Sequence, residues 1–472
     1  MVQRYNFSGI RPTKKDKKMS NSLERGNFGT KLGVILATAG GAVGLGNVWR
    51  FPYVTGQNGG AAFIVIYFLC VLIMGVPVML CEFLIGRHAQ TNTARAYSKL
   101  ANGTPWKWVG YMGVLTAALI IGYYGVVSGW TLQYVLASVT GQLHGTPDDF
   151  RAYFSEFSTN PIKPIIWMTL LVGMTHYVIV HGIEDGIEKA SKIMMPLLFL
   201  LLLVLVGCSL MLPGAMDGVE FLLKPDFSKV TGKTFLEALG QSFFSLSIAM
   251  GCLCTYASYF KRETNLVGTA FQISIIDTFV AILAGLMIFP AAMSVGVQPD
   301  SGPSLIFITL PNVFEQAFGS MPVVQYVVSL AFYVLLSIAA LTSNISLHEV
   351  STSFLSEELR IGRRKAATFV SLMCVIVGAF CSLSLGGWEW AKLFGMPFFD
   401  LFDWFTANIC LPLGGFFTCL FIGWYVEHKI IHDEITNWGT SNYHFFHLFV
   451  FVVKYICPLF ILFIFLHQLG WV

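Results

Sequence analysis

Charged residues are scarce in this chain of 472 residues, of which Asp, Glu, Lys and Arg together make up only 12%. An ordinary soluble domain carries roughly 25%. A soluble protein of this length would form two or three domains, each with a polar surface, and these charges are too few to cover them. The composition therefore disfavours a soluble enzyme, a disordered scaffold and a secreted disulfide-rich protein.

The sequence also lacks the features of other classes of protein. The net charge is only +3, so no basic face is expected and nucleic acid is not a predicted partner. All ten cysteines lie in apolar runs rather than in loops, so no disulfide framework is visible. We find no nucleophile–base set and no metal cluster in the sequence, and we therefore do not expect an enzyme.

Long apolar runs dominate what is present, since 55% of the residues are hydrophobic. A helix needs about 20 apolar residues to cross the hydrocarbon core of a bilayer, and eleven runs come close to that length. The chain is therefore predicted to be an all-α polytopic membrane protein with about eleven transmembrane helices. The predicted helices are 31–56, 61–85, 109–139, 164–181, 192–212, 235–259, 266–296, 322–359, 366–383, 397–424 and 444–467.

Lys and Arg are distributed unevenly between the loops, and this asymmetry predicts the orientation of the chain in its membrane. If the N-terminus is cytoplasmic, most Lys and Arg residues fall in cytoplasmic segments. Eleven helices then leave the C-terminus outside. The loops on the outer side contain only Arg151, Lys163, Lys224, Lys229, Lys233 and Lys392.

The chain is predicted to have four segments. Residues 1–30 are polar and basic, without a hydrophobic period, and form a cytoplasmic tail. Residues 31–212 hold the first five helices, and residues 235–424 hold helices six to ten. Residues 444–472 hold the eleventh helix and a short external C-terminus.

Helices one and six are predicted to be interrupted. The first contains Gly40–Asn47 and the sixth contains Ser245–Gly251, both rich in small residues. Glycine costs about 1 kcal/mol in a helix interior, and unwound backbone at membrane depth is tolerated where neighbouring protein satisfies it. Glu82, near the end of the second helix, is expected to brace the unwound segments. Breaks five helices apart point to a secondary transporter with a five-plus-five inverted repeat.

Three motifs carry a resemblance to a known family. They are Gly40–Pro52 (GGAVGLGNVWRFP) with the following Asn58–Gly60, then Ser242–Tyr259, and then Leu341–Asn344. They resemble the first, sixth and eighth helices of the neurotransmitter:sodium symporters, among which the bacterial amino-acid transporters have eleven helices. The resemblance implies a sodium-coupled symporter that imports its substrate by alternating access, here in the plasma membrane of a bacterium.

Gly44 predicts the substrate class. Monoamine transporters of the family have Asp at this position, whereas its amino-acid transporters have Gly because the substrate brings its own carboxylate. A buried Asp beside that carboxylate would be an unfavourable like-charge pair. The apolar lining, with an adaptable Met, suits a neutral hydrophobic or aromatic L-amino acid. The resemblance places the substrate against Ala42, Gly44, Gly46, Ile120, Tyr124, Phe244, Ser245, Ser247, Met250, Gly251, Ser343 and Leu347.

Asp277 lies within an apolar helix, where an acid costs roughly 2.5–3.5 kcal/mol. Carboxylate, hydroxyl and carbonyl oxygens are ligands for hard cations. By resemblance, two sodium ions are expected as cofactors. The first site would be formed by Ala42, Asn47, Ser245 and Asp277, and the second by Gly40, Val43, Ala339, Thr342 and Ser343.

Chloride-dependent relatives hold the anion with a Tyr, a Gln and two Ser residues. Tyr67, Gln241 and Ser245 match three of these positions, but the fourth is Ala281. Asp277 stands where an Asn is more usual, and its fixed carboxylate can supply the negative charge of chloride. We therefore predict chloride independence.

Two pairs of gates are implied by the resemblance. Arg50 and Asp403 would form the outer gate. Arg25, Phe28 and Glu357 would form the inner one, with Glu at a position usually occupied by Asp. A proton-coupled transporter with Asp277 as the proton carrier, and an amino-acid sensor that transports nothing, remain as alternatives. The sequence leaves the exact amino acid and the oligomeric state open.

Overall fold

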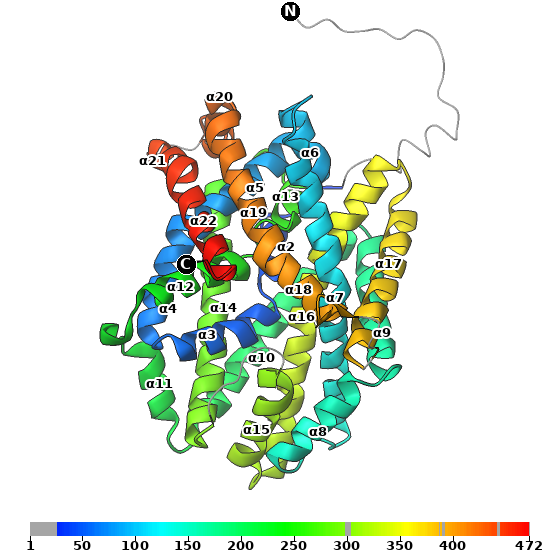
Figure 1. The fold of residues 1–472 in the computed structure, drawn as a ribbon, viewed down its shortest axis with the longest axis vertical. Helices are drawn as coiled ribbons and strands as arrows, with labels where there is room; N and C mark the ends of the chain where they lie inside the picture. Colours follow the sequence, from blue (N-terminus) through cyan, green and yellow to red (C-terminus); the bar gives the residue numbers. More distant parts are fainter. Residues whose placement is uncertain (1–25, 298–303, 387, 389–391, 441–443, 472) are drawn as a thin grey trace, which may run out of the picture.

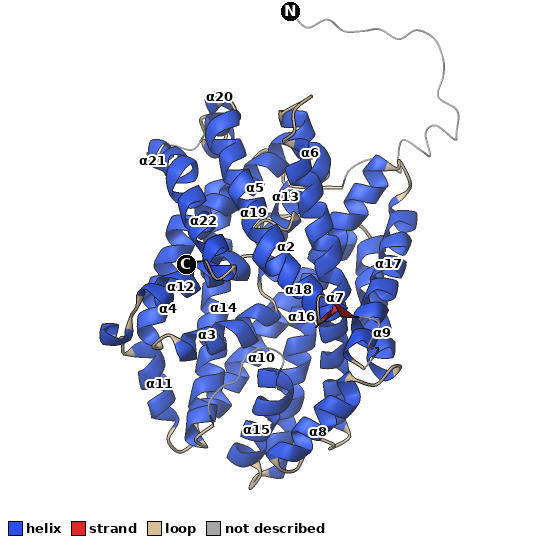
Figure 2. Cartoon of the chain, in the orientation of Figure 1, coloured by secondary structure: helices blue, strands red, loops and turns tan. Residues whose placement is uncertain are grey.

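The computed structural model describes residues 26–297, 304–386, 388, 392–440 and 444–471. Helices make up nearly all of the regular structure in these ranges (Figures 1 and 2). The strands among the described residues are β1 (Lys392–Leu393) and β2 (Met396–Pro397), which pair in an antiparallel hairpin. The predicted all-α fold is confirmed, while Arg25 and residues 1–24 of the predicted tail lie outside the described residues.

Nine helices in the described part of the chain are long and apolar enough to cross a membrane. Their ends agree with the predicted runs to within a few residues, except that the fifth begins at Ile183 rather than at Lys192. The acidic residues Glu184, Asp185 and Glu188 interrupt the apolar pattern there. The nine are α4–α5 (Ala61–Ala89), α7 (Lys107–Val139), α9 (Lys163–Val180), η3–α10 (Ile183–Leu210), α14 (Leu266–Ser294), α16 (Pro322–Glu358), α17 (Arg363–Leu385), α18–α19 (Phe398–Tyr425) and α21–α22 (Phe446–Gln468).

The first predicted helix is bent. α2 (Lys31–Ala42) and the stretch from Gly46 to Gln57, which holds η1 (Gly46–Arg50) and α3 (Phe51–Gln57), meet at 57° and can count together as a tenth span. The sixth predicted helix consists of α12 (Gly232–Ser245) and α13 (Cys252–Ala257), each too short to span alone. Both predicted breaks are therefore confirmed, and the count of eleven stays a prediction.

Short helices lie at the two ends of the bundle. α6 (Thr93–Leu100) and α20 (His428–Ile435) are at one end, and α8 (Pro147–Ser158), α11 (Ala215–Leu223) and α15 (Leu310–Phe318) are at the other (Figure 1). The first turn of α8 is closed by a capping box between Thr146 and Asp149. The sequence patterns above did not predict these five helices.

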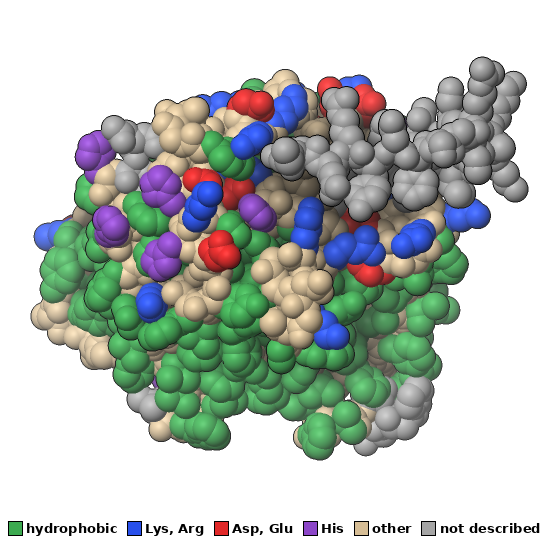
Figure 3. All heavy atoms as spheres, turned by 90° about the horizontal axis from the view of Figure 1, so that it is seen from above, with side chains coloured by type: hydrophobic (Ala, Val, Ile, Leu, Met, Phe, Trp, Pro, Cys, Tyr) green, Lys and Arg blue, Asp and Glu red, His purple; other side chains and the backbone are tan. Residues whose placement is uncertain are grey.

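Large apolar side chains cover the sides of the bundle. Ile166 of α9, Ile193 of α10 and Phe369 of α17 are 59%, 69% and 60% exposed. Seen from the α6 end, charged and histidine side chains gather over one part of the surface and hydrophobic ones fill the lower part of the view (Figure 3). An apolar surface of this extent is expected to face lipid rather than water.

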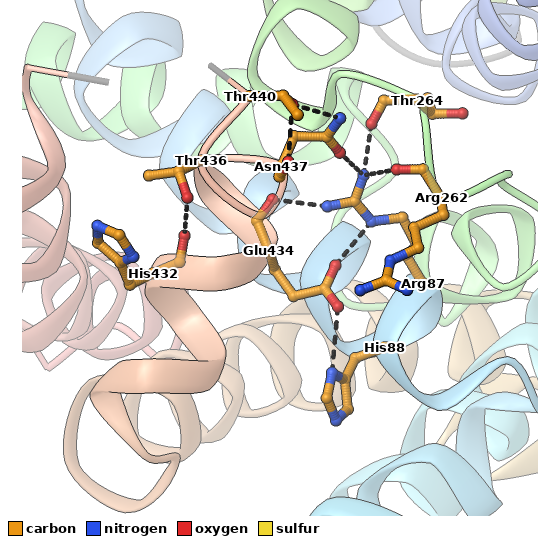
Figure 4. A network of polar contacts seen from close by, with 9 residues as sticks. All are labelled: Arg87, His88, Arg262, Thr264, His432, Glu434, Thr436, Asn437 and Thr440. Atoms are coloured by element: carbon orange, nitrogen blue, oxygen red, sulfur yellow. Dashed lines mark hydrogen bonds and ion pairs between the residues drawn. The ribbon is translucent and has the colours of Figure 1, made fainter. Parts of the chain in front are cut away.

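A buried arginine joins three segments at the α6 end (Figure 4). Arg87, at the end of α5, donates from Nε to Glu434 Oε2 of α20 at 2.7 Å and from Nη2 to the Glu434 carbonyl at 2.6 Å. Its Nη1 donates to Asn437 Oδ1 at 2.9 Å and to the Thr264 carbonyl. Trp438 lies against both Arg87 and Arg262, with the guanidinium carbons 5.0 and 4.0 Å from its ring centroid. All three nitrogens of the buried Arg87 guanidinium thus donate to acceptors of the protein.

Candidate functional site

One cavity of about 510 Å³ lies where the two helix breaks meet α7, α16 and α18–α19. All the predicted substrate residues except Gly251 line it. Gly251 lies behind the wall, where a side chain would contact Thr93 and Val350. The predicted residues on the wall are Ala42, Gly44, Gly46, Ile120, Tyr124, Phe244, Ser245, Ser247, Met250, Ser343 and Leu347.

The glycines of the first break leave room for the side chains that surround them. A Cβ at Gly44 would stand 2.6 Å from Ser343 Oγ and 3.2 Å from Tyr124 Oη, and a Cβ at Gly46 would stand 2.8 Å from Phe244 Cε1. Leu45 N, freed from helical bonding, donates to Tyr124 Oη at 3.3 Å. A side chain at position 44 would therefore displace the polar groups that face the cavity.

The second break contains strained backbone. Ser247 and Ala249 have φ of 53° and 67°, which non-glycine residues rarely adopt. The Glu82 carboxylate accepts from Ala249 N at 2.6 Å and from Cys254 N at 3.3 Å. Ser247 Oγ donates to the Gly41 carbonyl at 3.1 Å, which joins the two breaks. The expected bracing role of Glu82 is thus borne out at the second break.

A carboxylate lies buried between the breaks. Asp277 of α14 accepts from Ser245 Oγ at 2.6 Å and from Asn47 Nδ2 at 2.8 Å. Asn47 Oδ1 in turn accepts from Gly44 N at 3.0 Å. All three predicted side-chain ligands of the first sodium site are therefore in contact, together with the backbone of the break. The cluster offers the carboxylate, hydroxyl and amide oxygens that hard cations prefer.

The second predicted sodium site lies where α2 crosses α16. Ser343 Oγ is 3.4 Å from the Val43 carbonyl, to which it donates. A Cβ at Gly40 would stand 3.4 Å from Thr342 Cβ. Thr342 Oγ1 donates to the Ala339 carbonyl at 3.0 Å. These five residues thus come together across two helices, and their oxygens are of the kind that binds sodium. Among the described residues, no group of three or more His, Cys, Asp or Glu could hold a metal ion.

The positions compared with a chloride site are buried close to the Asp277 cluster. Gln241 stands one turn before Ser245 on α12, and its two amide atoms have no hydrogen-bond partner among the described residues. The Tyr67 ring packs on Phe51, with centroids 5.1 Å apart. Ala281 presents only a methyl group, one turn beyond Asp277 on α14.

The two residues predicted to form the outer gate both lie in the cavity wall. The Arg50 guanidinium lies over the Phe244 ring, 4.7 Å from its centroid. Arg50 and Asp403 both line the cavity, but neither is in an ion pair with the other in the described structure. Two further acids, Glu237 and Asp400, line the same wall, and the sequence interpretation missed both. A lone acid inside an apolar run, such as Glu237, was the available signal.

Two of the residues predicted to form the inner gate, Phe28 and Glu357, lie within the described part of the chain. Phe28 is buried, with its ring centroid 5.9 Å from that of Tyr256. Glu357 Oε2 accepts from Thr91 Oγ1 at 2.6 Å and from Asn92 N at 2.8 Å. Arg25 lies outside the described residues, so its predicted pairing with this group stays a prediction.

A second buried carboxylate near this gate was not predicted. Glu349 of α16 is in a two-point ion pair with Arg363, at 2.8 and 2.5 Å, and accepts from Tyr259 Oη at 2.6 Å. The sequence signal was an acid in the middle of an apolar helix. Its partners could not be inferred, since Tyr259 is far away in the sequence.

Most of the chain is similar to known transport proteins. The family described as "Sodium:neurotransmitter symporter family" matches residues 25–149 and 158–471. An uncharacterized sodium-dependent transporter of Bacillus subtilis, YhdH, is 37% identical over 445 residues, covering 94% of this chain and 97% of the relative.

Two further similarities extend this result. The human sodium- and chloride-dependent GABA transporter 2 is 26% identical over 478 residues, covering 91% of this chain and 77% of the relative. The crystal structure of MhsT in complex with L-phenylalanine matches with a TM-score of 0.84 and 39% identity, covering 94% of this chain and all of that one.

Proposed function

Because this chain belongs to the sodium:neurotransmitter symporter family, we propose that it imports a neutral hydrophobic or aromatic L-amino acid, driven by sodium. The L-phenylalanine bound in the similar structure of MhsT supports an aromatic or hydrophobic substrate. The cavity supports the same choice, because Ile120, Met250 and Leu347 contribute apolar side chains to its wall.

The observation that carries the proposal is the Asp277–Ser245–Asn47 cluster. It joins both helix breaks, and Ser245 and Asn47 also line the cavity. A sodium ion held there would lie beside the substrate carboxylate, which would complete its ligands. Because sodium and the amino acid would share this cluster, each should raise the affinity of the protein for the other by the same factor.

The transport cycle follows alternating access. Sodium at both sites stabilises the open outer side, and the substrate then closes Tyr124 and Phe244 over itself. Release of the second sodium opens the inner side. We propose a cytoplasmic N-terminus, an external C-terminus and a location in the plasma membrane of a bacterium. Each ligand shifts the equilibrium only by its differential affinity for the two states.

Chloride independence is part of the proposal. The Asp277 carboxylate is fixed by Ser245 and Asn47, and Ala281 has no hydroxyl to offer an anion. Substrate binding in sodium gluconate should equal binding in sodium chloride. A strict chloride requirement would contradict this part of the proposal.

The test is equilibrium binding of labelled L-amino acids to the purified chain, in sodium and in potassium. We expect tight binding of one apolar or aromatic amino acid in sodium alone. An Asp277→Asn variant should lose most of the sodium dependence, whereas Asp217→Asn on α11 serves as a matched control. Equal binding in both salts would remove sodium coupling.

A second candidate is proton-coupled uptake on the same fold. The buried Asp277 carboxylate, with hydroxyl and amide donors on both oxygens, could carry a proton. Uptake into proteoliposomes under a pH gradient without sodium would favour this candidate. Binding without uptake under either gradient would instead indicate a sensor.

A further inference from the structure

A buried carboxylate joins the start of the first broken helix to the beginning of α10. Glu188, at the end of η3 (Ile183–Glu188), is 1% exposed. Its Oε2 accepts from Gly29 N at 2.6 Å, and its Oε1 accepts from Thr30 Oγ1 at 2.6 Å. Lys192 Nζ donates to the same Oε1 at 2.6 Å and balances the charge. All these donors are arranged around one buried anion.

The contact acts on the N-terminal end of α2, where a helix carries partial positive charge. Thr30 is the N-cap residue, and its Oγ1 accepts from Gly33 N at 3.0 Å while donating to Glu188. One hydroxyl therefore connects the first turn of α2 to the carboxylate. Hydrogen bonds to an ionised acceptor are among the strong ones in proteins.

Two glycines near the start of α2 leave room for the acidic side chains of η3. A Cβ at Gly33 would overlap the Glu188 carboxyl group, and a Cβ at Gly29 would stand 2.7 Å from Glu184 Oε1. Neither glycine has a positive φ, so space rather than backbone conformation explains them. The close approach of α2 to η3 thus depends on the absence of side chains at these positions.

The other contacts of the 28–30 segment are of a different kind. Phe28 N donates to the Tyr259 carbonyl, and Lys261 Nζ donates to the Gly29 carbonyl, both at 3.2 Å. These partners follow α13, the second half of the other broken helix. Glu188 belongs instead to the continuous span that leads into α10. Glu188 therefore makes a polar contact between the start of a broken helix and an unbroken neighbour.

The C-terminal end of α2 lies at the proposed second sodium site. There Gly40 lies against Thr342 of α16, and the Val43 carbonyl accepts from Ser343 Oγ. If the start of α2 leaves α10, the short helix between these points must tilt. The carbonyls would then move away from the hydroxyls of α16, and the second sodium would lose part of its coordination.

We propose that Glu188 is a positioning residue that latches α2 in the closed arrangement, so that its release opens the path from the second sodium site. The proposal rests on the proposed function of the chain. It predicts that a weaker latch lowers the fraction of protein able to bind sodium, which lowers the apparent sodium affinity in proportion. The contacts to the amino acid are untouched, so substrate affinity at saturating sodium should not change.

The test is substrate binding to the full chain, titrated with sodium, for two variants. Glu188→Gln removes the charge at nearly constant shape, and Gly33→Ala displaces the carboxylate without removing it. Each should raise the half-saturating sodium concentration by about three- to tenfold, on the population argument above. Asp185→Asn is the control, because Asp185 makes the same kind of ion pair with Lys189, at 2.6 Å, on the exposed face. The control should behave as the wild type.

A direct readout distinguishes the latch from a general loss of stability. Backbone amides of 31–42 should exchange hydrogen faster in both variants in potassium, and slow to the wild-type rate in sodium. A general loss of stability predicts faster exchange that sodium does not reverse. Wild-type sodium curves in both variants would overturn the latch, as would faster exchange that persists in sodium. If Glu188→Gln does not fold, Gly33→Ala alone decides between these outcomes. Absence of sodium-dependent binding in the wild type would instead overturn the proposed function.

Discussion

The two helix breaks both line the cavity, but their backbone conformations differ. In the first, Val43 is extended and neither Gly44 nor Gly46 has a positive φ. In the second, Ser247 and Ala249 are left-handed although they have side chains. The first break is therefore relaxed in its backbone but crowded around its glycines, whereas the second is strained in its backbone.

This difference shows that a helix break can be constrained in two ways, by the space around its residues or by their backbone conformation. At Gly44 the requirement is room, because Ser343 Oγ and Tyr124 Oη occupy the space of a side chain. At the second break the conformation itself is unfavourable, and the Glu82 carboxylate stabilises it by accepting from Ala249 N and Cys254 N. Substitutions should therefore affect binding at the first break and stability at the second.

The largest effect is expected for Gly44→Ala. The added methyl group would displace Ser343 Oγ and crowd Tyr124 Oη, and polar groups left unpaired cost about 1–3 kcal/mol each. We expect substrate affinity to fall roughly 100-fold, since each 1.4 kcal/mol is a factor of ten. Gly173→Ala on α9 is the control, because its Cβ would meet nothing within 4 Å. Radioligand binding measures both, and unchanged affinity in Gly44→Ala would remove the argument from space.

The next effect is expected for Glu82→Gln, which acts on the second break alone. A hydrogen bond to a charged group contributes about 1.5–3 kcal/mol, and the amide retains only one acceptor for two backbone donors. We expect the free energy of unfolding to fall by about 2 kcal/mol on this basis. Glu220→Gln, at an exposed ion pair with Lys224 on α11, should change little. Chemical denaturation in detergent compares the two, and equal stabilities would show that the second break needs no brace.

Alanine substitutions of two glycines should separate the effect of backbone strain from the effect of limited space. Gly251 has φ of 76° with its nearest would-be Cβ contacts at 3.4 Å, whereas Gly46 is limited by the Phe244 ring. Gly251→Ala should cost about 1–2 kcal/mol of stability, because L-residues are disfavoured in that conformation. Gly46→Ala should leave stability nearly unchanged and weaken binding. The reverse pattern would contradict the comparison.

The smallest expected effect is a difference in stability between two alanine-to-glycine variants. Such a substitution usually destabilises a helix, but at the second break it should also relieve strain. Ala249→Gly relieves a left-handed alanine, whereas Ala284→Gly in the regular helix α14 costs about 1 kcal/mol. Both variants lose one buried methyl group. We expect Ala249→Gly to be the more stable of the two by about 1–2 kcal/mol, the cost of the left-handed conformation. Thermal unfolding of both proteins in sodium-free buffer measures this difference.

The spans were predictable from sequence because each one is a long apolar run with polar ends. The helix starts at Lys31, Ala61, Leu266 and Pro322 were predicted to the residue. The short terminal helices were not, since amphipathic helices such as α15 carry no membrane signal. For α8 the sequence Thr146–Asp149 was a readable capping box. The start of the fifth span was missed because Glu184, Asp185 and Glu188 interrupt the apolar run, although Asp185 and Glu188 pair with lysines four residues later.

The cavity was predictable to the extent that its residues belong to recognisable motifs. Gly44 and Phe244 lie in the motifs of the first and sixth helices, and both line the cavity. Asp403 followed from the resemblance alone, and Glu237 was missed because it belongs to no motif. Contacts such as Gly29 with Glu188 join residues 159 positions apart, and no local pattern encodes such a distance.

The buried Arg87 has a consequence for the order in which the chain is made. Its main partner, Glu434, follows it by 347 residues. At roughly 5–20 residues per second, a ribosome needs on the order of tens of seconds to deliver that partner. Until then the guanidinium must stay in water at the membrane surface, because an unpaired charge is too costly to bury. The α6 end of the bundle is therefore expected to be assembled last, and truncations before α20 should leave nascent chains that proteases cut near residue 87.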